Sequence, residues 1–229
     1  MLEPAAVEVL AVVVDGVMGE ALDELGISHG RHATDSVGSM ARLPQVTRDE
    51  LDAEGQATYD RLLAGFNARP GYTQQTRVGG LYGLLMHSPE LAARISAVGD
   101  YILQEGGIEF LDKEIVCLTV ARETNCQLEW TVHEPMSRDA GVPEETIQGI
   151  KRSDYDVLLP RERLMADFSR EVLRDNVTDA TWKGVEALMG RKGAVNLTGL
   201  VTFTALICHC MDAFQLELPT GAEPLLPIG

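Results

Sequence analysis

The sequence predicts an all-α protein built as a helical bundle, and three observations carry this prediction. Helix-start signals recur along the chain, as a capping box at Thr47–Glu50 and as prolines at Pro89, Pro143 and Pro160. Between these signals, apolar residues repeat at the three- and four-residue steps of an amphipathic helix. No credible run of alternating strands follows residue 40.

The first helices follow from their capping residues. Thr47 and Glu50 supply a hydroxyl and a carboxylate that satisfy free amide groups, so a helix should begin there. Ser88 caps the next helix, and Pro89 occupies its first turn, where a missing N–H does no harm. Gly106–Gly107 should end that helix.

The later helices follow in close succession. The sequence predicts them at residues 111–124, at 126–140 before Gly141, and from Pro143, Pro160 and Thr178. A last helix over roughly residues 194–216 is apolar around nearly its whole circumference. We therefore expect this last helix at the centre of the core.

Composition excludes several classes of partner. The 229 residues carry 19 Lys and Arg against 35 Asp and Glu, a net charge of -16 that repels nucleic acid and anionic lipid surfaces. The hydrophobic content of 45% and charged content of 24% are those of an ordinary soluble globule. The uninterrupted apolar runs fall short of the roughly 20 residues of a membrane helix. We expect a cytoplasmic protein with no nucleic-acid or membrane partner.

Residues 1–39 differ in composition from the rest of the chain. Their second half, GISHGRHATDSVGS, is rich in glycine, serine and histidine, which is typical of a linker. Met40 then opens a stretch that resembles a natural protein start. We expect residues 1–39 to be a dispensable extension, and residues 40–229 to form the helical domain.

A thiol, a carboxylate and an imidazole recur at helical spacing in the stretch NCQLEWTVHEP. Glu129 and His133 are separated by four residues, and Cys126 precedes Glu129 by one turn on the same face. A carboxylate beside an imidazole favours the protonated ring and fixes its tautomer, as a general acid and its orienting group require. The alternative interpretation is a solvated surface pair.

The four cysteines, Cys117, Cys126, Cys208 and Cys210, are too few for a disulfide framework, so reduced thiols are expected. Cys126 has two interpretations. It is either a small buried residue at a helix start, or a thiolate stabilised by the helix N-terminus and by His133. No H-E-x-x-H or C-x-x-C spacing is present, so no metal site is predicted.

Four segments together resemble the carboxymuconolactone decarboxylase superfamily, which also contains the alkylhydroperoxidase D-type proteins: MARLP at 40–44, HSPEL at 87–91, LDKEIVCLTVARETNCQLEWTVHEP at 111–135 and DAGVPEETIQGI at 139–150. The similarity spans residues 40–218 and implies the helical bundle of that superfamily. It also implies a homotrimer or homohexamer.

The resemblance implies roles for individual residues. Peroxidases of this superfamily use a C-x-x-C pair, a histidine four residues later and an upstream glutamate. These map to Cys126, Glu129 in place of the second cysteine, His133 and Glu114. Because Glu129 replaces the resolving thiol, the Glu129-Trp130-x-x-His133 pattern is closer to the decarboxylase branch.

The leading hypothesis is therefore an acid/base enzyme that needs no cofactor and acts on a small lactone or carbonyl compound. His133 would donate the proton, Glu129 would orient it or act as a second base, and Glu114 would relay charge from the preceding helix. Substrate contacts are expected from Trp130, Arg122 and His209. Arg122 has a surface salt bridge as its alternative role, and His209 that of a core histidine.

Two other functions remain open from the sequence. One is a thiol-dependent peroxidase that uses Cys126 alone, with an external thiol as resolver. The other is an oligomer that binds a small ligand without catalysis.

Overall fold

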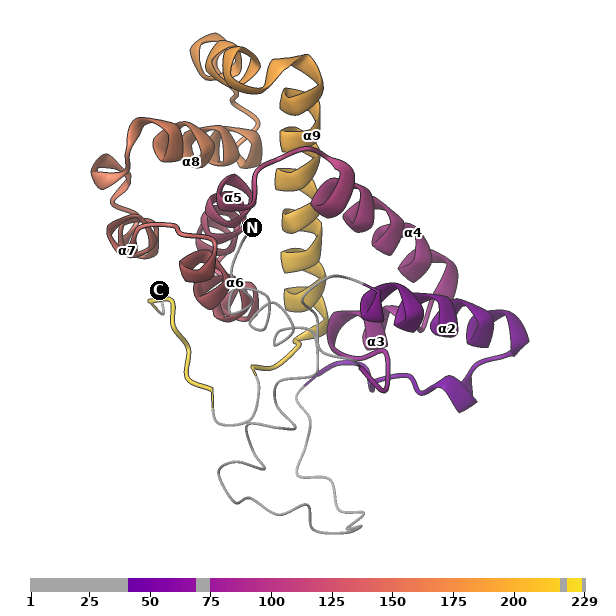
Figure 1. Ribbon diagram of the computed structural model, residues 1–229. Helices are drawn as coiled ribbons and strands as arrows, with labels where there is room; N and C mark the ends of the chain where they lie inside the picture. Colours follow the sequence, from indigo (N-terminus) through magenta and orange to yellow (C-terminus); the bar gives the residue numbers. More distant parts are fainter. Residues whose placement is uncertain (1–40, 69–74, 219–221, 228–229) are drawn as a thin grey trace. The chain divides into compact units, whose positions relative to one another are not determined.

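A computed structural model describes residues 41–68, 75–218 and 222–227. These residues contain helices and no strand, which confirms the predicted all-α fold (Figure 1). The predicted extension, residues 1–39, lies outside the described residues. The helices are α2 (Ala53–Asn67), α3 (Gly80–Leu85), α4 (Pro89–Asp100), α5 (Phe110–Glu123), α6 (Gln127–Asp139), α7 (Glu144–Arg152), α8 (Pro160–Leu173) and α9 (Asp179–Phe214), with short turns η3 (Arg48–Glu50), η4 (Tyr101–Glu105) and η5 (Tyr155–Val157).

The described chain divides into two compact units. The first comprises residues 41–96 and 214–218, and the second comprises residues 97–213 and 222–227, so that α4 begins in the first unit and ends in the second. All the candidate site residues belong to the second unit.

The first unit is built on α2 and α3. The amide of Val78 donates a hydrogen bond to the hydroxyl of Tyr59 at 2.8 Å, and the rings of Phe66 and Tyr82 meet edge to face at 5.0 Å. The predicted capping box at Thr47 is present, with the backbone N–H of Thr47 donating to Glu50 at 2.7 Å. It starts only the short turn η3, because Leu51 returns to extended backbone, and α2 has its own N-cap.

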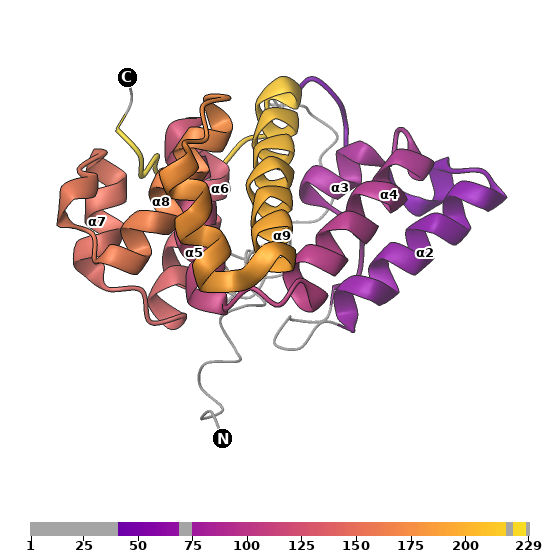
Figure 2. The same cartoon turned by 90° about the horizontal axis from the view of Figure 1, so that it is seen from above.

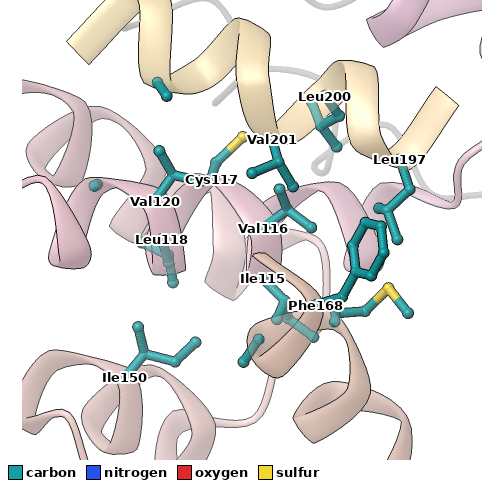
Figure 3. Packing of buried hydrophobic residues seen from close by; sticks show 14 of the residues in the cluster. Ile115, Val116, Cys117, Leu118, Val120, Ile150, Phe168, Leu197, Leu200 and Val201 are labelled. Atoms are coloured by element: carbon teal, nitrogen blue, oxygen red, sulfur yellow. The ribbon is translucent and has the colours of Figure 1, made fainter. Parts of the chain in front are cut away.

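The second unit surrounds α5. Packing on all sides leaves the side chains of α5 from Glu114 to Ala121 almost fully buried, and α6, α7 and α8 each contact it. Figures 1 and 2 both show α9 running alongside α5. In Figure 3, Leu197, Leu200 and Val201 of α9 lie over Val116 and Cys117 of α5. This apolar packing is the main source of the unit's stability.

The long helix α9 is interrupted at Gly190. This glycine has φ 70° and ψ 174°, so the chain turns there between two helical parts, as the sequence predicted. Thr178 caps the first part, since its hydroxyl accepts a hydrogen bond from the amide of Thr181 at 3.2 Å.

The expectation that the last helix lies at the centre of the core holds for one of its faces. One face packs on α5, but Val195 and Leu206 on the other are 63% and 40% exposed. In α9, threonine and glycine residues separate short apolar runs without adding charge. The whole helix is therefore long and apolar enough to cross a membrane, although each uninterrupted apolar run is too short to do so. A core helix of a soluble protein has the same property, and 44% of this apolar stretch is buried here.

We predict that Gly190→Ala destabilises the second unit by about 1–3 kcal/mol, since an L side chain at this backbone conformation is strained although nothing crowds the position. Urea unfolding followed by circular dichroism measures the change. Gly65→Ala is the control, because Gly65 lies within α2 in open space, and the same substitution there should be neutral or slightly stabilising. Equal stability of Gly190→Ala and the wild type would contradict the strain at this turn.

Candidate functional site

A tight turn brings the two motif helices together. α5 ends at Glu123, Asn125 adopts a left-handed conformation with φ 54°, and the amide of Cys126 donates to the carbonyl of Ala121 at 2.8 Å. Asparagine tolerates this conformation better than most residues, which explains its place at the turn. The chain then returns as α6 beside α5, so residues far apart along the two helices meet (Figure 1).

His133 lies between two carboxyl groups. Its Nδ1 is 2.9 Å from Oε2 of Glu114 on α5, and its Nε2 is 3.3 Å from Oε1 of Glu129, one turn earlier on α6. The His133 side chain is 14% exposed, against 3% for Glu114 and 8% for Glu129. The structure thus brings together the three residues to which the sequence analysis gave acid/base roles.

The surroundings of His133 favour its protonated form. Burial lowers its pKa, whereas the interactions with Cys117, Glu114 and Glu129 raise it, and the net result is a pKa well above 6.5. Burial also raises the pKa of Cys117, which is therefore a neutral thiol near pH 7. The two glutamates carry the charge that holds His133 as an imidazolium.

Cys117 is a site residue that the sequence analysis missed. It lies three residues after Glu114 on the same face of α5 and interacts with His133 through a hydrogen bond. Its sulfur, a carboxylate oxygen of Glu129 and a ring nitrogen of His133 lie within 4.8 Å of one another, a grouping that could hold a metal ion. Its i, i+3 spacing from Glu114 is the sequence signal that could have identified it.

Cys126 is the N-cap of α6 and is 9% exposed. A hydrogen bond with Cys208 lowers its pKa, burial opposes this, and the backbone amides of Glu129 and Leu128 lower it further, so that the net shift is downward. The helix N-terminus thus favours the thiolate of Cys126, although the Cys126 side chain makes no capping hydrogen bond. The expected stabilisation of the Cys126 thiolate by His133 is not among these causes. The imidazole of His133 interacts with the Cys117 side chain instead.

A stripe of α9 closes the site from the other side. Thr204, Cys208 and Met211 follow one another at steps of four and three, on one face of the helix. The hydroxyl of Thr204 is 3.9 Å from the sulfur of Cys117, and the sulfur of Met211 is 3.9 Å from that of Cys126. Cys208, between them, interacts with Cys126.

The three residues predicted to contact substrate lie elsewhere. Trp130 is fully buried, and its ring N–H donates to Glu134 at 2.9 Å, so its role is in packing and it offers no accessible surface. Arg122 donates to the carbonyl of Lys151 at 3.0 Å, which is a structural contact between α5 and α7. His209 is exposed, which excludes the interpretation as a core histidine, because it points away from the stripe that packs on α5.

Residues 89–167 match the sequence model of the carboxymuconolactone decarboxylase family. This part of the chain, from α4 to α8, is therefore similar in sequence to the carboxymuconolactone decarboxylase family. The matched residues include Glu114, Cys117, Cys126, Glu129 and His133, whereas the α9 stripe lies beyond them. The match is to the family as a whole and assigns neither branch. A search of curated proteins finds no match to this sequence.

A similar fold is seen in the crystal structure of an alkylhydroperoxidase AhpD core, an uncharacterized peroxidase-related protein from Ralstonia eutropha JMP134. The two chains superpose with a TM-score of 0.60 over 79% of this chain and 93% of the other, at 16% sequence identity. This likeness establishes a common fold.

We predict that Glu114→Gln lowers the pKa of His133, because a neutral amide replaces the carboxylate on Nδ1. Titration of the His133 ring by NMR measures the shift, and Glu90→Gln, a change at an exposed ion pair in α4, should leave that pKa unaltered.

The same interaction has a consequence for stability. Since the folded-state pKa lies above 6.5, the pairing stabilises the folded wild type fully below about pH 6.5 and is lost as pH rises through the folded-state pKa. Glu114→Gln should flatten this dependence. A pKa for His133 below 6.5 in the wild type would contradict the described electrostatics.

Proposed function

We propose that the protein is an acid/base enzyme that works without an organic cofactor and returns a proton to a carbon atom beside a carbonyl or lactone group. The observation that carries this proposal is the buried imidazolium of His133, held between Glu114 and Glu129. A buried proton donor with a raised pKa, fixed in orientation by a carboxylate, is what general acid catalysis needs.

The contacts of His133 suggest separate roles for its two nitrogens. Nδ1 makes the shorter contact, to Glu114 on the more deeply buried side, so Glu114 orients the ring and stabilises its charge. Nε2 has the longer contact of 3.3 Å to Glu129 on the same helix. A substrate that displaces the Glu129 carboxyl group from Nε2 would receive the proton there, and Glu129 would then accept a proton from another atom of the substrate.

In the decarboxylating form of this reaction, the bond between the leaving carboxylate and the adjacent carbon breaks and its electron pair passes into the conjugated carbonyl. The result is carbon dioxide and a dienolate. His133 then donates its proton from Nε2 to carbon, and the ring is protonated again from solvent. Stabilisation of the enolate charge by the imidazolium supplies the electrostatic part of catalysis.

Charge in the site favours a substrate with little negative charge of its own. Two carboxyl groups face one imidazolium. Two cationic side chains of α5 are already hydrogen-bonded to backbone carbonyls: Arg122 donates to that of Lys151, and Lys113 donates to that of Leu103. A neutral or singly charged lactone or keto acid therefore fits better than a polyanion.

We predict that His133→Gln reduces turnover about a hundred- to ten-thousand-fold, since glutamine can hydrogen-bond to Glu114 but cannot deliver a proton. The assay follows carbon dioxide release, and deuterium incorporation at carbon in heavy water, for a panel of γ-carboxymuconolactone, neutral lactones and keto acids. Cys210→Ser, a change outside the proton-donating group, is the matched control and should keep wild-type rates. An active wild type with an equally active His133→Gln would refute the role of His133, and no turnover across the panel would count against the proposal.

A further inference from the structure

We propose that Cys117, Glu129 and His133 bind a single Zn²⁺ ion, and that Glu114 holds the imidazole in place from its other ring nitrogen. The sequence analysis predicted no metal site because it considered ligand spacings within one segment, whereas these ligands come from both α5 and α6. Binding of the ion is measured without any substrate, so this inference does not rest on the acid/base function proposed above.

The first support is the set of donor atoms. The sulfur of Cys117, a carboxylate oxygen of Glu129 and a ring nitrogen of His133 all lie within 4.8 Å of one another. Thiolate, imidazole and carboxylate are the three ligand types of Zn²⁺ in proteins, and three protein ligands leave the fourth tetrahedral position for water. Mg²⁺ and Ca²⁺ bind oxygen ligands, so a set with sulfur and nitrogen favours Zn²⁺ over them.

The second support is the spacing of these atoms. Nδ1 of His133 faces Glu114, and Nε2 lies 3.3 Å from Oε1 of Glu129. Nitrogen and oxygen ligands of one tetrahedral Zn²⁺ ion are about 3.3–3.5 Å apart, so this pair can share an ion almost without moving. A sulfur ligand lies about 3.6 Å from either atom, so Cys117 completes the triangle with a shift on the order of 1 Å.

The third support is the contact on the far side of the imidazole. A metal-bound histidine commonly donates its other ring N–H to a carboxylate, which fixes the tautomer and the orientation of the ring. Glu114 is placed for this role, since its side chain is 3% exposed and its Oε2 lies 2.9 Å from Nδ1 of His133. It precedes Cys117 by three residues on α5, so one helical turn carries both the orienting carboxylate and the sulfur ligand.

The exchange of protons for the ion balances in charge. The protonated site holds the His133 imidazolium, the neutral Cys117 thiol and two carboxylates. Zn²⁺ binds as the proton on Nε2 and the proton on sulfur leave, so two positive charges enter and two depart. The buried site therefore gains no net charge, which avoids a large desolvation penalty. The ion occupies the place of the transferable proton, so bound Zn²⁺ switches off the proton donor.

The test titrates the full-length reduced protein, after treatment with a chelator, with Co²⁺ and then with Zn²⁺. We expect one ion per chain, a thiolate-to-cobalt charge-transfer band in the near ultraviolet and the strong visible bands of four-coordinate Co²⁺. Added Zn²⁺ should remove these bands by displacing Co²⁺. Absence of the charge-transfer band in the wild type overturns the proposal, and this readout needs no variant.

Variants assign the ligands, with circular dichroism as the check on folding. Cys117→Ser should lose the charge-transfer band, and His133→Gln should weaken Zn²⁺ binding more than about a hundredfold, measured against a chromophoric chelator. Glu114→Gln, a change beyond the ligands, should weaken binding about ten- to a hundredfold. Cys126→Ser and Cys210→Ser are the controls and should keep the wild-type spectrum and affinity. A spectrum that survives Cys117→Ser and disappears in a control would overturn the proposal.

Failure of this site and failure of the acid/base function give different results. Binding is followed without turnover, and turnover of the lactone and keto-acid panel is followed in the presence of a chelator. Where turnover is observed, saturating Zn²⁺ should abolish it and the chelator should restore it. A Zn²⁺-loaded protein with undiminished turnover would contradict the shared position of the ion and the proton.

Discussion

The pairing of His133 with Glu114 and Glu129 is the interaction on which the rest of the site depends. All three side chains are largely withdrawn from water, and a buried charge without a partner costs several kcal/mol. Loss of either glutamate would leave the other groups in an unfavourable environment. The surrounding apolar shell is compatible with these charges only because groups of opposite charge are in direct contact.

That requirement constrains the helices around it. Glu114 reaches His133 only because the turn at Asn125 returns α6 alongside α5, and α5 keeps its orientation because it is packed on nearly every side. Such rigid support is what a proton donor needs, since small displacements between acid and substrate lower rates sharply. The stability of the core and the geometry of the site therefore have the same structural cause.

Glu129 links the imidazole of His133 with the cysteines near the start of α6. Its side chain contacts His133, and its negative charge raises the pKa of both Cys126 and Cys208. In the C-x-x-C peroxidase pattern the same position holds a thiol. Replacement by a carboxylate removes that thiol and adds a base beside the imidazole.

The sequence by itself determined the helices and the face of α6 that bears Cys126, Glu129 and His133, because capping residues, glycines and three- and four-residue spacings are local properties. The family motif added Glu114. Only the tertiary structure decided that Cys117 and Cys208 join this group, and that Trp130, Arg122 and His209 do not, because these outcomes depend on which helices pack together. Cys208 lies 82 residues after Cys126, and no local pattern links residues so far apart. The exposed face of α9 was missed for the same reason, since composition alone does not reveal which side of an apolar helix has a neighbour.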